Sequence, residues 1–110
     1  MEMNRKVAIV TGGASGIGRA ICNELVQQNV FVIISDINEQ AGKNFEAELN
    51  SETIKARYVY LDVTNYESVE KLLTEIYREF GRIDYLFNNA GIAMYGELYD
   101  MPEETWKAVY

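Results

Sequence analysis

The stretch V-A-I-V-T-G-G-A-S-G-I-G-R, residues Val7 to Arg19, decides the fold of this chain. Val7 to Val10 form the continuous apolar run of a strand buried on both faces, and from Ile17 apolar residues recur at helical spacing. Glycines at such a junction let backbone N–H groups approach a phosphate and aim the positive end of the helix at it. The stretch therefore predicts a strand, a turn and a helix that bind a nucleotide pyrophosphate, with the turn built on Gly12, Gly13, Gly16 and Gly18.

The spacing of these glycines distinguishes between kinds of phosphate-binding loop. A Walker-type loop needs Lys followed by Ser or Thr after its last glycine, but Arg19 stands there in this chain. The G-x-G-x-x-G fingerprint of many dinucleotide-binding proteins is also absent, because the pattern is Thr11-Gly12-x-x-x-Gly16-x-Gly18. Plain turns and close helix packing use glycine too, so the assignment depends on the segments that follow.

Strand patterns and helix patterns alternate along the rest of the chain. After the first helix, the pattern predicts strands at Val30–Ile34, Ala56–Leu61 and Ile83–Phe87, and helices at Asn38–Leu49 and Thr64–Phe80. Such alternation predicts an α/β fold with parallel strands in the order 3-2-1-4, because crossovers between parallel strands are right-handed. The first two helices then cover one face of the sheet and the later helices cover the other.

Local features refine this prediction at several element ends. The polar residues of the third strand suit an edge of the sheet, and Thr64-x-x-Glu67 resembles a capping box at the start of the third helix. Asn38 is expected to cap the second helix, and Gly81 to end the third. A last helix is expected to begin near Pro102 and to be unfinished at Tyr110, which would leave the fourth strand as an unpaired apolar edge.

Composition limits the class of protein. The 110 residues, 48% of them hydrophobic, suit one small domain, and a net charge of −7 argues against a nucleic-acid or anionic-membrane surface. The chain has no His, which excludes Ser-His-Asp and Cys-His catalysis within it, and with one Cys we expect no metal site. That residue, Cys22, is expected to be a packed or partly exposed thiol rather than a nucleophile. Neither a signal peptide nor a membrane span is apparent, so we expect a cytoplasmic protein.

Chemically distinctive residues follow each predicted strand at its carboxyl end. Asp36 follows the second strand, where its carboxylate could accept hydrogen bonds from both hydroxyls of an adenosine ribose and would repel a 2′-phosphate. Neither Ser15 nor Ile37 supplies the cation that a phosphorylated ribose needs, so NAD is favoured over NADP. Asp36 could instead be a solvated loop acid or a cap for the next helix, but its position at the end of the second strand favours the ribose role.

The third and fourth strands end in similar candidates. Asp62 could accept a hydrogen bond from the adenine amine while Val63 packs against the ring, although an acid before a capped helix is also common. The run Asn88-Asn89-Ala90-Gly91 combines amides that can brace strands with small residues that let a cofactor approach the backbone. An ordinary turn could use the same four residues.

Together these motifs resemble the N-terminal half of the short-chain dehydrogenases/reductases. The resemblance rests on the glycine pattern, Asp36, Asp62-Val63 and Asn88 to Gly91, in this order and spacing. It implies a Rossmann-type doubly wound parallel sheet, truncated after the fourth strand and the start of the next helix, that binds NAD. It places Gly12, Ser15, Gly16, Ile17 and Gly18 at the pyrophosphate, Asp36 and Ile37 at the ribose, Asp62 and Val63 at the adenine, and Asn89, Ala90 and Gly91 at the nicotinamide side.

The resemblance also implies an oxidoreductase that transfers a hydride between NAD and a small carbonyl or alcohol substrate. Family members transfer the proton with a Ser, a Tyr and a Lys four residues after that Tyr. Here no Tyr has Lys four positions later, and no Ser follows Gly91. We therefore expect residues 1–110 to be the cofactor-binding part of a longer homo-oligomeric enzyme, with the catalytic residues outside them and no activity of their own.

Two alternatives stay open at this point. The chain could be a stand-alone module that binds a dinucleotide or only associates, and such a module would protect its fourth strand, for instance across a dimer. A nucleoside-dependent methyltransferase shares the strand, the glycine turn and the acid, but it leaves Asn88 to Gly91 unexplained.

Overall fold

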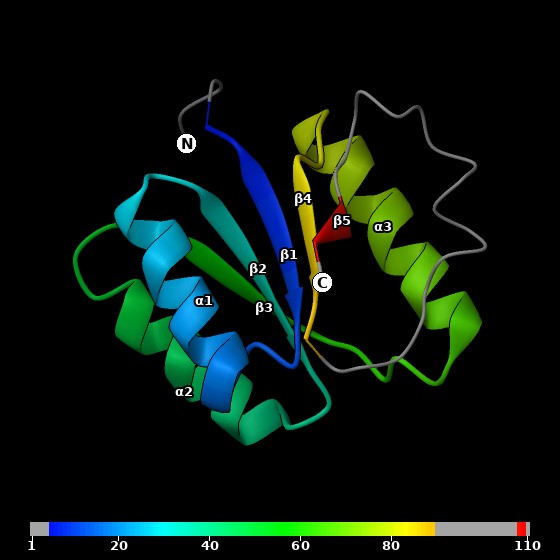
Figure 1. Ribbon diagram of the computed structural model, residues 1–110, viewed down its shortest axis with the longest axis horizontal. Coiled ribbons are helices and arrows are strands. Elements are labelled where there is room, and N and C mark those ends of the chain that lie inside the picture. Colours follow the sequence, from blue (N-terminus) through cyan, green and yellow to red (C-terminus); the bar gives the residue numbers. More distant parts are fainter. Residues whose placement is uncertain (1–4, 90–107, 110) are drawn as a thin grey trace.

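The computed structural model describes residues 5–89 and the backbone of residues 108–109 (Figure 1). Strands and helices alternate as the sequence predicts, which confirms the α/β class. In chain order the elements are β1 (Val7–Thr11), α1 (Gly16–Gln27), β2 (Phe31–Asp36), α2 (Glu39–Leu49), β3 (Ala56–Tyr60), α3 (Tyr66–Phe80), β4 (Tyr85–Asn88) and β5 (Ala108–Val109).

The strands form one parallel sheet in the order β3-β2-β1-β4-β5. This confirms the predicted order 3-2-1-4 and the position of the third strand at an edge. β1 lies in the middle, and its last residue, Thr11, pairs with Ser35 of β2 and Asn88 of β4. The carboxyl ends of these strands therefore meet at one end of the sheet, where the winding direction changes.

The fourth strand corrects one expectation. The sequence predicts an unpaired edge at β4 and a helix that continues to Tyr110, but Leu86 pairs with Ala108 and Phe87 with Val109. The physical reason is that an open strand edge presents unpaired N–H and C=O groups, which another extended segment can satisfy. The predicted helix start at Pro102 lies outside the described residues.

Helices cover both faces of the sheet, as predicted (Figure 1). Side chains alternate along a strand, so Ala8 and Val10 pack with α1 and α2 on one face. Val7 and Ile9 face the other side and pack with α3. This double burial explains why β1 and β2 read as continuous apolar runs in the sequence.

The ends of two helices agree with the sequence, and the start of α3 differs. Asn38 caps α2 by accepting a hydrogen bond from Ala41 N across 3.0 Å, and Gly81 ends α3 with a φ of 75°. The predicted capping box is wrong, because Asn65 caps α3. Thr64 instead donates its hydroxyl to the Asp62 carboxylate across 2.6 Å, which moves the helix start by one residue. Across residues 5–89, no helix combines the length and apolar character needed to cross a membrane.

Candidate functional site

A cleft of about 290 Å³ lies at the carboxyl end of the sheet. In open α/β sheets ligands bind outside the carboxyl ends of the strands, next to the point where the winding reverses. Every lining residue except Leu61 is one that the sequence predicts. The lining residues are Gly12, Ser15, Asp36, Ile37, Leu61, Asp62, Val63 and Asn89.

The turn between β1 and α1 depends on glycine at three positions. Gly12 and Gly16 have φ values of 64° and 55°, in the left-handed region that other residues adopt only at a cost. A Cβ on Gly18 would lie 2.0 Å from the carbonyl oxygen of Gly12, so only glycine lets α1 approach the turn this closely. Of the predicted pyrophosphate residues, Gly16, Ile17 and Gly18 lie in the first turn of α1 and do not line the cleft.

The N-terminus of α1 suits an anionic ligand. Ser15 occupies the cap position with an exposed side chain that makes no capping hydrogen bond, and the first turn carries no acidic residue. The first N–H groups of a helix have no intrahelical partner, and the helix dipole makes this end positive. The side chain of Ile17 is 73% exposed and points away from the core. A phosphate placed here would meet backbone donors and no competing carboxylate from α1.

Asp36 connects three segments at the mouth of the cleft. Its carboxylate accepts a hydrogen bond from Ala14 N in the glycine turn across 3.1 Å, and another from Asn38 N across 2.9 Å. Its backbone carbonyl accepts from Leu61 N across 3.2 Å. Asp36 is therefore not a loose loop acid, and the helix cap is Asn38. The neighbouring Ile37 leaves 58% of its surface exposed at the rim.

Asp62 faces the cleft from the segment after β3. The hydroxyl and the backbone N–H of Thr64 both donate to its Oδ1, at 2.6 Å and 3.0 Å. These hydrogen bonds lower the pKa of Asp62, so its carboxylate is charged at neutral pH. Next to it, Val63 is half-buried and packs against the core on the α3 side.

Asn89 braces the glycine turn from the opposite side of the cleft. Its Nδ2 donates to the carbonyl oxygen of Gly12 across 3.2 Å. One strand position earlier, the Thr11 hydroxyl donates to the Phe87 carbonyl across 3.3 Å. The turns after β1 and β4 are thereby held together. The other two predicted nicotinamide-side residues, Ala90 and Gly91, lie outside the described residues.

Two residues of this region escape sequence reasoning. Leu61 is buried and lines the cleft, and its only signal is that it is the last apolar residue of the third strand pattern. Tyr58, on β3, donates its hydroxyl to the backbone carbonyl of Asp36 across 2.7 Å. No short-range pattern marks that contact, because the two residues meet only when β2 and β3 pair.

Cys22 lies in the core behind the turn, as predicted. It is fully buried, and its thiol contacts the carbonyl oxygen of Gly13 at 3.8 Å. Burial raises the pKa of the Cys22 thiol to about 12, although a hydrogen bond with the backbone of Cys22 itself opposes this. The residue is therefore a neutral packing group at neutral pH.

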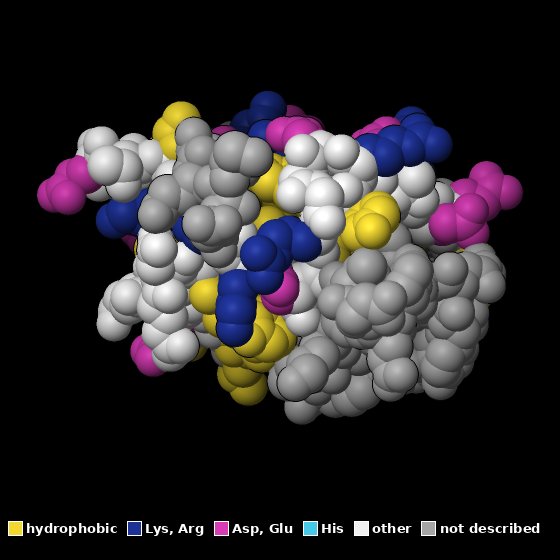
Figure 2. All heavy atoms as spheres, turned by 90° about the horizontal axis from the view of Figure 1, so that it is seen from above, with side chains coloured by type: hydrophobic (Ala, Val, Ile, Leu, Met, Phe, Trp, Pro, Cys, Tyr) yellow, Lys and Arg dark blue, Asp and Glu magenta, His cyan; other side chains and the backbone are white. Residues whose placement is uncertain are grey.

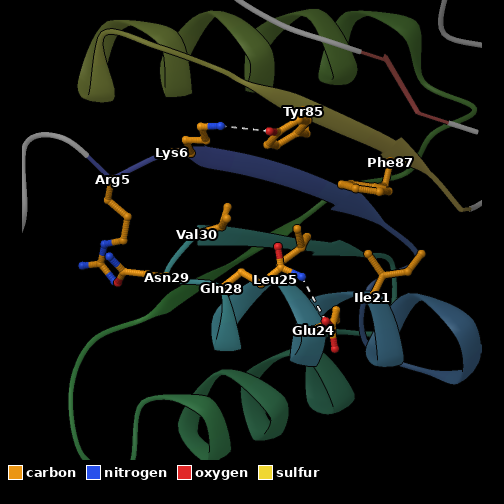
Figure 3. Close-up of a pocket in the computed structure, with 10 residues that line it drawn as sticks. All are labelled: Arg5, Lys6, Ile21, Glu24, Leu25, Gln28, Asn29, Val30, Tyr85 and Phe87. Atoms are coloured by element: carbon orange, nitrogen blue, oxygen red, sulfur yellow. Dashed lines mark hydrogen bonds between the residues drawn. The ribbon is translucent and has the colours of Figure 1, made fainter.

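A larger groove of about 640 Å³ lies beside α1 and β4, toward the amino ends of the strands (Figure 3). Lys6 and Tyr85 hydrogen-bond across part of it at 3.2 Å, and Ile21 and Phe87 contribute apolar walls. Figure 2 looks onto the amino end of the sheet and shows Lys or Arg side chains beside hydrophobic ones. Of the predicted site residues that the structure describes, none lines this groove, and within residues 5–89 no helix N-terminus borders it. We therefore take the smaller cleft as the candidate ligand site.

Known proteins resemble this chain over most of its length. The family model described as short chain dehydrogenase matches residues 6–110. The NAD-dependent glycerol dehydrogenase of Listeria innocua is 40% identical over 101 residues, which cover 92% of this chain and 39% of that protein. The 3-oxoacyl-[acyl-carrier-protein] reductase FabG of Haemophilus influenzae is 42% identical over 104 residues, which cover 94% of this chain and 42% of that reductase.

Solved structures show the same fold. The NAD+-bound xylitol dehydrogenase superposes with a TM-score of 0.73 at 36% identity, covering 84% of this chain and 35% of that one. The menthone neomenthol reductase of Mentha piperita superposes with a TM-score of 0.73 at 33% identity, covering 81% and 32%. The chain thus spans less than half the length of the proteins it matches.

Proposed function

The chain belongs to the short chain dehydrogenase family, and we propose that its cleft binds NAD as the cofactor-binding part of a dehydrogenase or reductase. The observation that carries this proposal is that the glycine turn and Asp36 line one cleft and are joined by the hydrogen bond from Ala14 N. A positive helix end and a fixed carboxylate side by side suit a ligand that combines a pyrophosphate with a ribose diol.

The pyrophosphate would lie against the glycine turn and the start of α1. Backbone N–H groups would donate to its oxygens, which needs no cationic side chain. The absence of acidic residues from the first turn of α1 supports this placement. The residues proposed for this part of the site are Gly12, Ser15, Gly16, Ile17 and Gly18.

The adenosine ribose would lie against Asp36 and Ile37. A carboxylate can accept hydrogen bonds from two ribose hydroxyls but repels a 2′-phosphate, so we propose NAD rather than NADP. Among residues 5–89, no Lys or Arg lines the cleft to offset that repulsion. Two relatives carry NAD in their names, the glycerol dehydrogenase and the xylitol dehydrogenase, which supports the same choice.

The two ends of the cofactor would occupy opposite sides of the cleft. The charged Asp62 would accept a hydrogen bond from the adenine amine, and Val63 would pack against the ring. Asn89 would line the nicotinamide side, together with Ala90 and Gly91. This order follows the strands across the sheet, from β3 at the adenine to β4 at the nicotinamide.

We propose that the full-length protein oxidises a small alcohol or reduces the matching carbonyl compound. The bound nicotinamide supplies the hydride acceptor or donor. Residues 1–110 would form the N-terminal part of a single NAD-binding domain and hold the cofactor, while the proton-transferring Ser, Tyr and Lys would come from outside this segment. We also propose that the full-length enzyme is a homo-oligomer.

Titration calorimetry on the full-length protein tests this function. We expect NAD to bind at least tenfold more tightly than NADP. Asp36→Ala should weaken NAD binding and reduce the ratio of NAD affinity to NADP affinity. An assay of NADH formation with a panel of small alcohols then tests the chemistry. NAD binding without turnover would favour the non-catalytic module, and no binding of either dinucleotide would overturn the proposal.

A further inference from the structure

Tyr58 holds the backbone of the residue proposed to bind the ribose. Its hydroxyl donates to the carbonyl oxygen of Asp36 across 2.7 Å, and Leu61 N donates to the same oxygen across 3.2 Å. These two donors come from β3 and its end, so the neighbouring strand fixes the last peptide of β2. The Asp36 carboxylate is then held by Ala14 N and Asn38 N.

The Tyr58 ring packs closely against Gly42 of α2. A Cβ on Gly42 would lie 2.1 Å from Cε1 and 2.2 Å from Cδ1 of this ring, so only glycine leaves room for it. The backbone N–H of Tyr58 donates to the Glu46 carboxylate across 2.7 Å, which ties the same residue to α2 again. The ring therefore fills the gap between α2 and β3, and its hydroxyl reaches Asp36.

The hydroxyl stays a donor over the physiological pH range. Burial raises the pKa of Tyr58, and the nearby carboxylates of Glu39 and Asp36 raise it further. A neutral phenol can donate its proton to only one acceptor at a time, and here that acceptor is the Asp36 carbonyl. The contact is thus a fixed part of the site rather than a titrating one.

From this geometry we propose that Tyr58, packed against Gly42, is a positioning residue that orients the Asp36 carboxylate toward the adenosine ribose. The inference rests on the proposed NAD site. Without the hydroxyl, the end of β2 keeps only the Leu61 hydrogen bond to that carbonyl, and the Asp36 side chain samples more orientations. Affinity for the ribose diol falls, whereas a 2′-phosphate gains nothing from the lost order.

The test compares Tyr58→Phe with Tyr60→Phe in the full-length protein. Tyr60 lies on the same strand and is 54% exposed. Tyr60→Phe therefore also removes a tyrosine hydroxyl from β3, but it leaves the packing of Tyr58 against Gly42 unchanged. Titration calorimetry with NAD and with NADP, and a thermal unfolding curve, are measured for each variant and for Asp36→Ala. We expect Tyr58→Phe to weaken NAD binding about fivefold, within the free energy of the one hydrogen bond that it removes, and to change NADP binding little. The unfolding temperature should fall by a few degrees at most, because that bond is partly buried within the protein.

The outcomes separate the inference from the proposed function. If Asp36→Ala weakens NAD binding but Tyr58→Phe binds NAD within twofold of the wild type, the role of Tyr58 is wrong and the NAD site stands. If Tyr58→Phe weakens NAD and NADP binding equally, the role of Tyr58 is only structural and the inference also fails, whatever the change in unfolding temperature. If the wild type does not bind NAD, both fail.

Gly42→Ala supplies a second perturbation of the same contact. The added Cβ displaces the Tyr58 ring, so we expect Gly42→Ala to weaken NAD binding when Tyr58 is present. In the Tyr58→Phe background the hydroxyl is already gone, and the same substitution is expected to change NAD affinity less than twofold. Equal effects in both backgrounds would show that Gly42 does not act through Tyr58.

Discussion

The side chain of Asn89 donates a hydrogen bond to the carbonyl oxygen of Gly12 across 3.2 Å, although 77 positions separate the two residues. The contact joins the turn after β4 to the glycine turn after β1. Gly18 packs into the same place, because its missing Cβ would lie 2.0 Å from that carbonyl oxygen and 2.7 Å from Asn89 Nδ2. The shape of the cleft thus depends on three residues from two distant turns.

Gly18→Ala is expected to destabilise the fold by about 1–3 kcal/mol, the usual cost of overpacking, despite the higher helix propensity of Ala. Gly16→Ala is the matched comparison, since it meets no atom within 4 Å and should cost about 1–2 kcal/mol from its positive φ alone. Urea unfolding measures both, and NAD binding should suffer more in Gly18→Ala. A Gly18→Ala protein as stable as the wild type would show that the close approach is unimportant.

Ser15→Asp should separate the stability of α1 from cofactor binding. Asp is as good a helix cap as Ser and suits the helix dipole, so the unfolding free energy should stay within about 1 kcal/mol of the wild type. A carboxylate at this position would repel the pyrophosphate, and NAD affinity should fall at least tenfold. Ser15→Ala is the control for loss of the hydroxyl, and it should weaken NAD binding less than Ser15→Asp does, because it introduces no negative charge. Unchanged NAD affinity in Ser15→Asp would place the pyrophosphate elsewhere.

The Cys22 thiol should report on unfolding rather than on chemistry. Burial raises its pKa from 9.0 to about 12 and shields the sulfur, so the native protein should react with a thiol reagent much more slowly than the urea-unfolded protein. The raised value also predicts that stability is fully present below pH 9.0 and falls as the pH rises toward about 12, because the unfolded thiol ionises first. Cys22→Ala should lack this part of the pH dependence. Rapid labelling of the native protein would contradict the buried position.

Asp84 should contribute stability that acid removes. Burial alone would raise the pKa of Asp84, but hydrogen bonds from Arg82 and from Val7 N outweigh this and lower it. A lowered native pKa contributes stability above the unfolded value, and that stability is lost as the pH falls through the native pKa. Asp84→Asn should therefore lower the free energy of unfolding by about 1–2 kcal/mol at pH 7. The difference in stability between this variant and the wild type should shrink in acid. Urea unfolding at several pH values checks this, and equal stability at neutral pH would refute it.

The central strands and the location of the cleft could be predicted from the sequence because they depend on local patterns. Val7 to Val10 form an unbroken apolar run since helices cover both sides of β1, and the carboxyl ends of parallel strands must meet. Asp36, Asp62 and Asn89 could therefore be placed around one cleft before any distance was known.

Other features depend on packing between distant segments. The contact between Tyr58 and Asp36 spans 22 positions and exists only because Gly42 leaves space for the ring. Asn65 rather than Thr64 caps α3, because the Thr64 hydroxyl donates to the Asp62 carboxylate. A capping pattern in the sequence does not reveal that Asp62 competes for this hydroxyl. The pairing of β4 with residues 108–109 likewise depends on an open edge rather than on helix signals in the sequence.

The most direct test of the proposed site is hydrogen–deuterium exchange of the full-length protein with and without saturating NAD. If the cleft is the cofactor site, NAD should slow amide exchange in peptides covering residues 11–18, 36–38 and 61–64. Peptides from the larger groove, residues 21–30 and 84–87, should exchange at an unchanged rate and serve as the internal control. Protection confined to the groove peptides, or no protection at all, would contradict the account.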